Sequence, residues 1–389
     1  MKKLVEVCTE IKDGDWIESK DQSETGIRLV QTGNVGNGIY LEKNERAKYI
    51  SEDTFNNLKC TEIFAGDILI SRLPSPVGRA CIFPNINERA ITAVDCTILR
   101  VDKKICLPKY LVYYTKSNLY SRQIGSFVVG TTRLRISRKN LEGIKIKVPS
   151  LQEQEKIVRI LDKAQELIDK RKEQIETLDE LVKSKFIEMF GNLKNEEKVP
   201  LEKCTTFIDY RGKTPTLSDN GIRIINAKSV GNGFFKYIEE YISEETYNLW
   251  MKRGFPVAGD VLFVTEGHTF GNVCRIPNDL TKFAMGQRVI TMQGENGMLN
   301  NAFLAQYMQS MAFKIDIDKY KTGSSAQGIR SKELQKILIP IPDIKFQNQF
   351  ADFVKQVEKL KLEMEQSLKE LEDNFNSLMQ RAYKGELFN

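Results

Sequence analysis

Residues 141–162 read LEGIKIKVPSLQEQEKIVRILD, a short apolar stretch that ends at Pro149 and leads into a strongly periodic segment. Residues 334–354, LQKILIPIPDIKFQNQFADFV, have the same design. An offset of 193 residues places the apolar frame and the proline of the first stretch on Leu334, Ile337, Ile339 and Pro342. The repeated order of short strand, proline and long helix indicates two copies of one unit.

The repeat extends over most of the 389 residues. Gly26-Ile27-Arg28 returns as Gly221-Ile222-Arg223, and the glycine-rich residues 35–38 return at 230–233. Ala65-Gly66-Asp67 returns as Ala258-Gly259-Asp260, and residues 130–132 correspond to residues 323–325. The matches are collinear, with offsets between 192 and 195, so we interpret the chain as a tandem duplication.

A long helix is predicted at the end of each copy. Ser150 and Glu153 form a capping-box pattern at the start of the first helix, and Gly191-Asn192 ends it. Its apolar residues recur every three or four positions, at Ile157, Leu161, Ala164, Ile168, Ile175, Leu178, Val182 and Met189. The second helix follows Pro342-Asp343 with the same pattern, at Phe350, Val354, Val357, Met364, Leu368, Leu371, Phe375 and Leu378. About 40 residues correspond to roughly 60 Å of helix.

This spacing is typical of a coiled-coil seam, so we expect the two helices to pack against each other. If they run antiparallel, the two globular parts lie at opposite ends, related by an approximate two-fold axis. An alternative stays open, in which each helix packs on its own globule.

The predicted fold class is α+β. Residues 68–70 and 261–264 are expected to form short buried strands, and helices are expected around 108–121 and 299–314. The predicted domains are a first globule at 1–149, a first long helix at 150–192, a second globule at 196–341 and a second long helix at 342–385.

Composition restricts the class of protein. Lys and Arg total 58 against 52 Asp and Glu, a net charge of +6, which permits a nucleic-acid partner without requiring one. Seven cysteines without a CxxC pair argue against a disulfide framework and a zinc cluster. The N-terminus has no signal-peptide pattern and no apolar run reaches a membrane span. The expectation is a soluble, cytoplasmic protein without membrane association.

Catalytic signatures are missing from the sequence. Its one histidine, His268, lies in a polar turn, which argues against a histidine-based metal centre or a repeated triad. Residues 211–214 resemble the end of a P-loop, but Phe207 stands where that motif requires glycine. The Asn/Asp-Pro-Pro-Tyr tetrapeptide of base methyltransferases is absent. We expect no catalytic residue, no metal ligand and no cofactor in this chain.

Polar loops occur at matching places in both copies, while the apolar frame between them repeats. Hydroxyl, amide and guanidinium groups suit phosphate oxygens and base edges. The pattern is that of two readers of different sequences on one scaffold. The candidate DNA-binding residues are Gln31, Asn34, Arg72, Arg79, Thr131, Thr132, Arg133, Arg135, Lys139, Asn226, Lys228, His268, Ser324, Ser325, Gln327, Arg330 and Lys332.

With these residues assembled, the chain resembles the specificity subunit of a type I restriction-modification system over almost its whole length. The resemblance rests on the duplication, on AGDILISR (65–72) and AGDVLFVT (258–265), and on the two quoted stretches that lead into the long helices. The openings IKDGDWIESK (11–20) and FIDYRGKTPT (207–216) are also of the family kind. The second helix departs from the usual start with PDIKFQNQF (342–350), which puts equal partner contacts at the two ends in doubt.

The resemblance implies that each globule is a target-recognition domain that reads one half of a split site in double-stranded DNA. It also implies an antiparallel helical spacer, two modification subunits that bring S-adenosylmethionine for adenine methylation, and motor-nuclease subunits as further partners. Three alternatives remain. One is the specificity subunit of a fused nuclease-methyltransferase, and the second is a coiled-coil protein-interaction adaptor. The third is an independent enzyme, for which we expect neither methyl transfer nor cleavage by the single chain.

Overall fold

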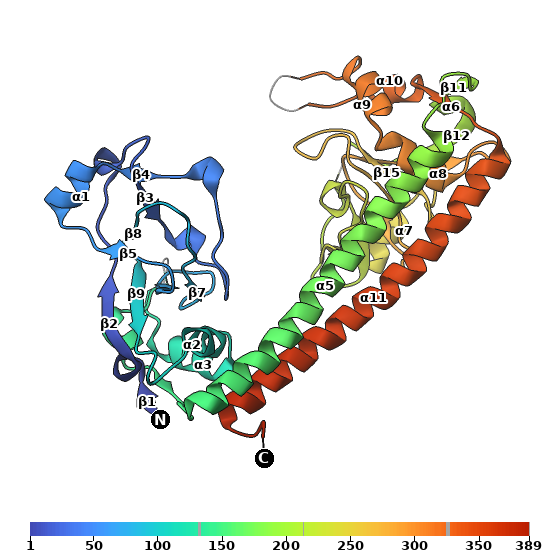
Figure 1. Cartoon of the computed structure of the whole chain (residues 1–389). Helices are drawn as coiled ribbons and strands as arrows, with labels where there is room; N and C mark the ends of the chain where they lie inside the picture. Colours follow the sequence, from blue (N-terminus) through green and yellow to red (C-terminus); the bar gives the residue numbers. More distant parts are fainter. Residues whose placement is uncertain (131–133, 213, 324–326, 389) are drawn as a thin grey trace. The chain divides into compact units, whose positions relative to one another are not determined.

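The computed structural model describes residues 1–130, 134–212, 214–323 and 327–388. The chain divides into two compact units. Unit 1 comprises Met1–Lys172 with Gln366–Asn389, and unit 2 comprises Glu173–Glu365. The division cuts through both long helices, α5 (Leu151–Phe190) and α11 (Ile344–Lys384), so each unit contains a globule and half of each helix (Figure 1).

Unit 1 contains two four-stranded sheets. The first has the strand order β2-β9-β6-β7, with β2 at Cys8–Asp13, β9 at Cys96–Val101, β6 at Ile68–Ser71 and β7 at Ala80–Ile82. The second has the order β4-β3-β8-β5, with β4 at Tyr49–Ile50, β3 at Ile27–Val30, β8 at Ala90–Thr92 and β5 at Glu62–Ile63. A two-stranded pair joins β1 (Lys2–Lys3) to β10 (Lys145–Ile146). The short helices of this globule are α1 (Glu52–Leu58), α2 (Pro108–Thr115), α3 (Asn118–Phe127) and α4 (Arg138–Glu142).

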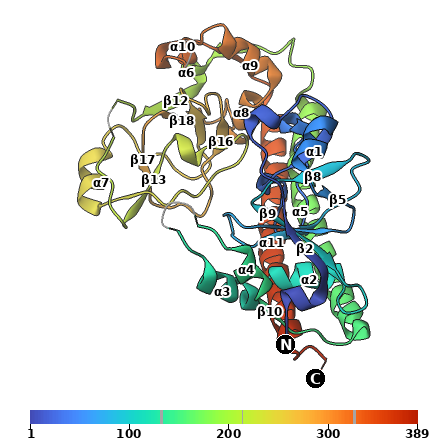
Figure 2. The ribbon, with the colours of Figure 1, turned by 90° about the vertical axis from the view of Figure 1, so that its left-hand side faces the viewer.

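Unit 2 repeats this topology, except that, among the residues described, its smaller sheet has three strands and lacks a counterpart of β5. Its larger sheet has the order β12-β18-β15-β16, with β12 at Thr205–Asp209, β18 at Val289–Gly294, β15 at Val261–Val264 and β16 at Val273–Arg275. The smaller sheet has the order β14-β13-β17, with β14 at Tyr241–Ile242, β13 at Ile222–Ile225 and β17 at Ala284–Met285, and β11 (Lys198–Pro200) pairs with β19 (Leu338–Pro340). The short helices are α6 (Leu201–Cys204), α7 (Glu244–Trp250), α8 (Asn301–Met308), α9 (Met311–Asp318) and α10 (Ser331–Gln335). Figure 2 shows α7 beside β13 and β17, where the Trp250 indole donates to the Met285 carbonyl at 2.7 Å.

Each helix predicted around 108–121 and 299–314 is in fact a pair of helices. Ser117 and Ser310 interrupt the two segments. Their hydroxyls accept the backbone N–H groups of Tyr120 at 3.2 Å and Phe313 at 3.3 Å, so each serine caps the second helix of its pair. Each segment has one continuous apolar periodicity, so the sequence pattern predicted a single helix and did not indicate the two caps.

The repeated Gly-Ile-Arg has a structural cause. Gly26 and Gly221 have φ angles of 127° and 124°, and a Cβ at either would lie 2.4 Å from the carbonyl oxygen of Ile50 or Ile242. A side chain therefore cannot be accommodated at either position. The following arginines lie over tyrosine rings, Arg28 over Tyr49 at 5.4 Å and Arg223 over Tyr241 at 5.3 Å.

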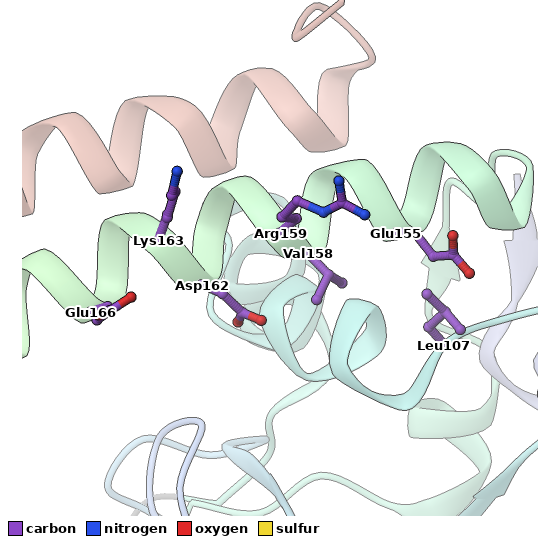
Figure 3. Close-up of a pocket in the computed structure, with 7 residues that line it drawn as sticks. All are labelled: Leu107, Glu155, Val158, Arg159, Asp162, Lys163 and Glu166. Carbon is purple, nitrogen blue, oxygen red and sulfur yellow. The ribbon is translucent and has the colours of Figure 1, made fainter.

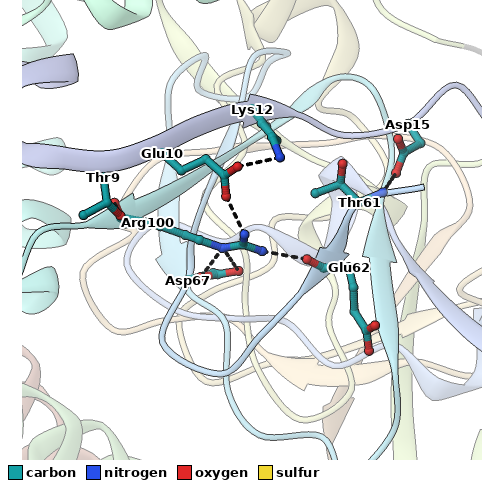
Figure 4. Close-up of polar contacts among 8 residues, drawn as sticks. All are labelled: Thr9, Glu10, Lys12, Asp15, Thr61, Glu62, Asp67 and Arg100. Carbon is teal, nitrogen blue, oxygen red and sulfur yellow. Dashed lines mark hydrogen bonds and ion pairs between the residues drawn. The ribbon is translucent and has the colours of Figure 1, made fainter. Parts of the chain in front are cut away.

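The repeated Ala-Gly-Asp closes a turn before an inner strand of each larger sheet, β6 in unit 1 and β15 in unit 2. Asp67 accepts the Phe64 N–H at 3.0 Å, and Asp260 accepts the Val257 N–H at 2.8 Å. Asp67 also contacts Arg100, whose guanidinium binds Glu10 and the Glu62 carbonyl (Figure 4). In unit 2, Gln293 replaces that arginine and donates to Asp260 at 2.8 Å, while burial raises the pKa of the Asp260 carboxyl. Both aspartates thus have a role inside the fold.

The two long helices pack against each other in an antiparallel manner. In unit 1 the start of α5 lies beside the end of α11, as the Lys172–Glu372 ion pair at 2.9 Å shows. In unit 2 the end of α5 lies beside the start of α11, joined by Lys361 and Asp179 at 2.7 Å. The predicted pairing of the helices is confirmed, and separate packing of each helix on its own globule is excluded.

Each globule is joined to the helix pair through a buried aromatic cluster. In unit 1, the Tyr383 hydroxyl of α11 donates to the Tyr110 carbonyl of α2 at 2.6 Å, and the Tyr383 side chain is 2% exposed. In unit 2, Phe186 and Phe190 of α5 pack against Phe350 of α11 and Phe303 of α8. One hydrophobic core therefore continues from each globule into its part of the helix pair.

Candidate nucleic-acid interface

Three segments of unit 1 that are far apart in the sequence meet beyond the end of β6. The Ile136 N–H donates to the Arg72 carbonyl at 3.3 Å, and the Arg72 N–H donates to the Asp95 carbonyl at 2.9 Å. These bonds bring the loop before α4, the end of β6 and the turn before β9 together. The Arg135 guanidinium, 46% exposed, contacts the Asp95 carboxylate at 2.9 Å on this surface.

Unit 2 uses the same backbone arrangement at positions that lie 193 residues further on. The Ile329 N–H donates to the Thr265 carbonyl at 2.9 Å, and the Thr265 N–H donates to the Arg288 carbonyl at 2.9 Å. The loop before α10 is tied further by the Gly267 N–H, which donates to the Gln327 carbonyl at 3.0 Å. The two units therefore present loops of equal construction at equivalent places.

The side chains on these equivalent loops differ in the position of their charges. In unit 1 the turn carries the acid, Asp95, and the loop carries Arg135. In unit 2 the turn carries the base, Arg288, which pairs with Glu266 at 3.1 Å and is 58% exposed. The basic residue therefore lies on the loop in unit 1 and on the turn in unit 2. One scaffold consequently offers two different patterns of donors and acceptors, which is what recognition of two different sequences requires.

Sequence reasoning missed Arg288 and Asp95. The offset of 193 that aligns the units also aligns these two residues. However, the change from Asp95 in unit 1 to Arg288 in unit 2 indicates a difference in recognition only when the turn is known to contact the loop before α4 or α10.

Several predicted residues lie exposed on or next to these loops. Arg135 and Gln327 lie within the loops, and Arg330 is the residue at the N-terminal cap of α10. Lys139 is exposed on α4, Lys332 is exposed on α10, and His268 is exposed in the turn after β15. Thr131, Thr132, Arg133, Ser324 and Ser325 were also predicted here and lie outside the described residues.

Arg72 and Arg79 are used inside unit 1, which argues against the predicted DNA contact. Arg72 is 4% exposed, donates to the Val94 carbonyl at 2.6 Å and lies 3.5 Å from the Asp13 carboxylate. Arg79 donates to four backbone carbonyls, those of Thr32, Val35, Leu73 and Pro76, at 2.6 to 3.0 Å. Burial lowers the pKa of both guanidinium groups. Arg79 therefore connects the turn at 32–35 to the loop after β6.

Replacing Arg79 by alanine should destabilise unit 1 by about 2 kcal/mol, because carbonyls that it satisfies would lose a charged donor. Thermal unfolding measures this change. Arg46→Ala, which removes an exposed arginine of the same unit, should leave the unfolding temperature nearly unchanged. An Arg79→Ala variant with unaltered unfolding and weakened DNA binding would instead support a DNA contact by Arg79.

The polar residues at the first predicted loop cap short turns. Asn34 is 6% exposed, accepts the Gln31 N–H at 2.9 Å and donates to the Leu41 carbonyl at 2.9 Å. In unit 2, Asn226 accepts the Lys228 N–H at 2.9 Å and donates to Glu240 at 2.7 Å, and the Lys228 ammonium also binds Glu240. Asn34 and Asn226 thus shape their turns, while Gln31 is half-buried and Lys228 is exposed.

A buried glutamine anchors the start of each long helix, at two positions that the offset of 193 residues aligns. Gln154 of α5 accepts the Leu107 N–H at 2.9 Å and donates to the Ile105 and Pro149 carbonyls, each at 2.9 Å. Gln347 of α11 makes the equivalent three bonds to Asn300, Met298 and Pro342. The helix starts that looked dissimilar in sequence are therefore held in the same way.

A metal centre, a membrane span and a ligand pocket are the other kinds of site that a chain of this size could hold. Among the described residues, no group of three or more His, Cys, Asp or Glu is placed to hold a metal ion. In the part of the chain that the structure covers, no helix is long and apolar enough to cross a membrane. A hollow of about 440 Å³ lies along α5 in unit 1, but its side chains, Arg159, Asp162 and Lys163 among them, point in different directions (Figure 3). That arrangement differs from the convergent polar groups of a ligand pocket.

The fold consists of two repeated α+β units with equivalent polar loops, and comparison with known sequences gives the family. The type I restriction modification DNA specificity domain matches residues 1–178 and again residues 199–373, and the chain belongs to this family.

Individual relatives are specificity subunits. The chain is 25% identical over 296 residues to the MjaVIII specificity subunit of Methanocaldococcus jannaschii, which covers 71% of this chain and 69% of the relative. It is 23% identical over 325 residues to the EcoKI specificity subunit of Escherichia coli K12, which covers 75% of this chain and 68% of that protein.

Solved structures share the fold. One match is a chain from a structure of a type I R-M system, described as a study of complex assembly and conformational transition. Its TM-score is 0.63 at 16% identity. The match covers 99% of this chain and 97% of that one. The S subunit from M. genitalium matches with a TM-score of 0.51 at 15% identity, over 98% of this chain and 95% of its own.

Proposed function

We propose that this chain reads a two-part DNA sequence as the specificity subunit of a type I restriction-modification complex, with one half-site read by each unit. The observation that carries the proposal is the displaced charge pair on one repeated scaffold. Asp95 and Arg135 face each other in unit 1, and Arg288 and Glu266 do so in unit 2. Identical loops would read a symmetric site, whereas these loops favour two different half-sites.

The exposed arginines are the groups that we assign to base recognition. A guanidinium can donate two hydrogen bonds to the major-groove edge of guanine. An arginine at a different place on the scaffold therefore changes which base pair is preferred at that position. The partner carboxylates fix each guanidinium before DNA binds, which reduces the entropy lost on complex formation.

The chemistry is assigned to other subunits. On this proposal the chain is non-catalytic and holds no cofactor, and two modification subunits bring S-adenosylmethionine and methylate adenine. The adenine must leave the base stack to be methylated, so this chain has to position duplex DNA for its partners. Motor-nuclease subunits, where they join, would cleave the unmethylated site. The modest charge of +6 is compatible with partners that supply part of the DNA contact.

Mapping of methylated adenines across the genome, with and without the gene, tests the proposal. A single bipartite motif should disappear when the gene is removed. Exchange of residues 196–341 for the matching segment of a relative should change one half-site and leave the other half-site and the gap intact. Loss of the gene without any change in methylation would contradict the assignment, and so would an exchange that alters both half-sites.

Arg330→Ala should weaken specific DNA binding by about 1–3 kcal/mol, or roughly 5- to 150-fold, and relax one position in the unit 2 half-site. The reason is loss of an exposed guanidinium at the cap of α10, beside the loop that carries Gln327. Lys345→Ala removes one exposed positive charge at the start of α11 and serves as the control. Equal weakening in both variants would indicate a general electrostatic effect rather than base recognition.

A further inference from the structure

A groove of about 1000 Å³ lies within unit 2, between the globule and the helix pair. Its walls are the end of α5, the start of α11, α8 and the loops before β14 and after β16. Val354, Val357 and Ala302 contribute apolar side chains to it. Three large side chains beside the groove are also exposed: Phe234 and Tyr237 are each 50% exposed, and Leu362 is 66% exposed. An open apolar groove of this size is typical of a binding surface.

The charge of the groove is strongly acidic, although the chain as a whole is basic. Seven acidic side chains line it against three basic ones. Each of the three bases is already paired with an acid of the groove, in Lys183–Glu180, Lys361–Asp179 and Arg275–Glu358. Among the described residues, no ion pair neutralises Glu173, Glu176 or Glu365, which are all exposed. These three carboxylates are therefore available to bind positive charge on another molecule.

This charge selects the kind of occupant. DNA carries a dense negative charge and would be repelled by unpaired carboxylates on the walls of the groove. A protein segment with apolar side chains on one face and Lys or Arg beside them matches both the apolar surface and the acidic rim. An amphipathic basic segment is thus the occupant that the chemistry favours.

The equivalent place in unit 1 lacks this acidic excess. Lys369 and Lys172 stand at the positions of Glu176 and Glu365, and Lys116 stands at the position of Gln309. The Lys116 ammonium lies 4.8 Å from the centre of the Phe375 ring and donates to Gln165 at 3.2 Å. A segment that is complementary to unit 2 therefore finds no matching excess of acidic side chains in unit 1.

We infer that the unit 2 groove is a docking site for a basic amphipathic segment of a protein partner, and that this partner binds the two units unequally. The inference does not depend on DNA reading. Its failure would leave the half-site experiments unaffected, and their failure would leave the groove unaffected.

A photo-crosslinking residue at Leu362 tests the occupant in the complex purified from its own cells, with the same residue at Asp169 as the unit 1 counterpart. The expected product from Leu362 joins this chain to a partner peptide rich in Lys or Arg, and Asp169 should not capture that peptide. A crosslink to DNA, to a second copy of this chain or to a peptide without basic excess would overturn the inference. Absence of any product from Leu362 would overturn it as well.

The captured peptide, made synthetically, then tests the charges. Its affinity for the full chain should fall at least about ten-fold in the triple variant Glu173→Lys, Glu176→Lys, Glu365→Lys. The control is Glu197→Lys, Glu202→Lys, Asp219→Lys, which reverses three exposed acids of unit 2 that do not line the groove. Circular dichroism and thermal unfolding establish that both variants are folded. Equal affinity for both triple variants would refute the role of the groove.

Discussion

A chain with seven extra residues in each long helix should direct methylation to a site with the same half-sites and a longer unread gap. The insertions are a copy of 166–172 placed after Lys172 and a copy of 359–365 placed after Glu365, the boundaries between the two units. Both units keep every residue, and a heptad preserves the seam to within about 20° of rotation.

The expected change in the gap follows from two opposing quantities. Seven residues add about 10.5 Å of helix, which matches about three base pairs at roughly 3.4 Å each. Each added base pair, however, rotates the second half-site by about 35° around the DNA axis, and the helix pair does not supply the whole of that rotation. We therefore expect a gain of one to about three base pairs, measured by mapping methylated adenines.

The matched control is insertion in α5 alone, which leaves seven residues without an opposite segment in α11. That variant should lose stability and methylation rather than acquire a longer gap. An unchanged gap in the doubly extended chain, with both half-sites retained, would show that something other than the helix pair sets the spacing.

Gln347→Ala should cost about 3 kcal/mol of the free energy of unfolding, with the loss in unit 2. Its side chain is fully buried and satisfies the Asn300 N–H and the Met298 and Pro342 carbonyls. Removing it leaves three backbone groups without hydrogen-bond partners. Each buried group without a partner costs about 1–3 kcal/mol, and water that enters the space offsets part of the total cost. Urea unfolding followed by circular dichroism measures the change.

Asn348→Ala is the neighbouring control. Asn348 accepts the Asn300 side-chain amide at 3.0 Å in an exposed bond, so its loss should cost less than about 1 kcal/mol. Equal losses in the two variants would mean that the buried glutamine does not anchor α11. Because Gln154 makes the same bonds in unit 1, Gln154→Ala should destabilise that unit to a similar extent.

Much of the fold could be predicted from the sequence because duplication and helix periodicity are local patterns. The offset of 193 identified the repeat, and the seam from Ile157 to Met189 identified a helix that runs from Leu151 to Phe190. The breaks at Ser117 and Ser310 were missed, since a serine within an apolar segment is read as part of one helix until its hydroxyl is seen to cap the next.

The site was less predictable because exposed and internally bonded arginines look alike in a sequence. Arg79 follows a glycine in a polar loop, as a DNA-contacting residue would, yet its guanidinium is held by four carbonyls from two loops. Arg288 follows Gln287 in a turn without any motif, and its importance depends on Glu266, more than twenty residues earlier. Such roles depend on contacts between distant segments, which local pattern does not report.

Unit 1 is assembled from the first 172 residues and from Gln366–Asn389, whereas unit 2 is one uninterrupted segment. During synthesis the ribosome releases all of unit 2 before the end of α11 that covers Tyr110 and Tyr114. Nascent chains fold as their segments emerge, at about 5–20 residues per second. Unit 1, whose synthesis begins first, is therefore completed last. A messenger RNA truncated near its 3′ end would yield a complete unit 2 and a unit 1 that lacks the end of α11.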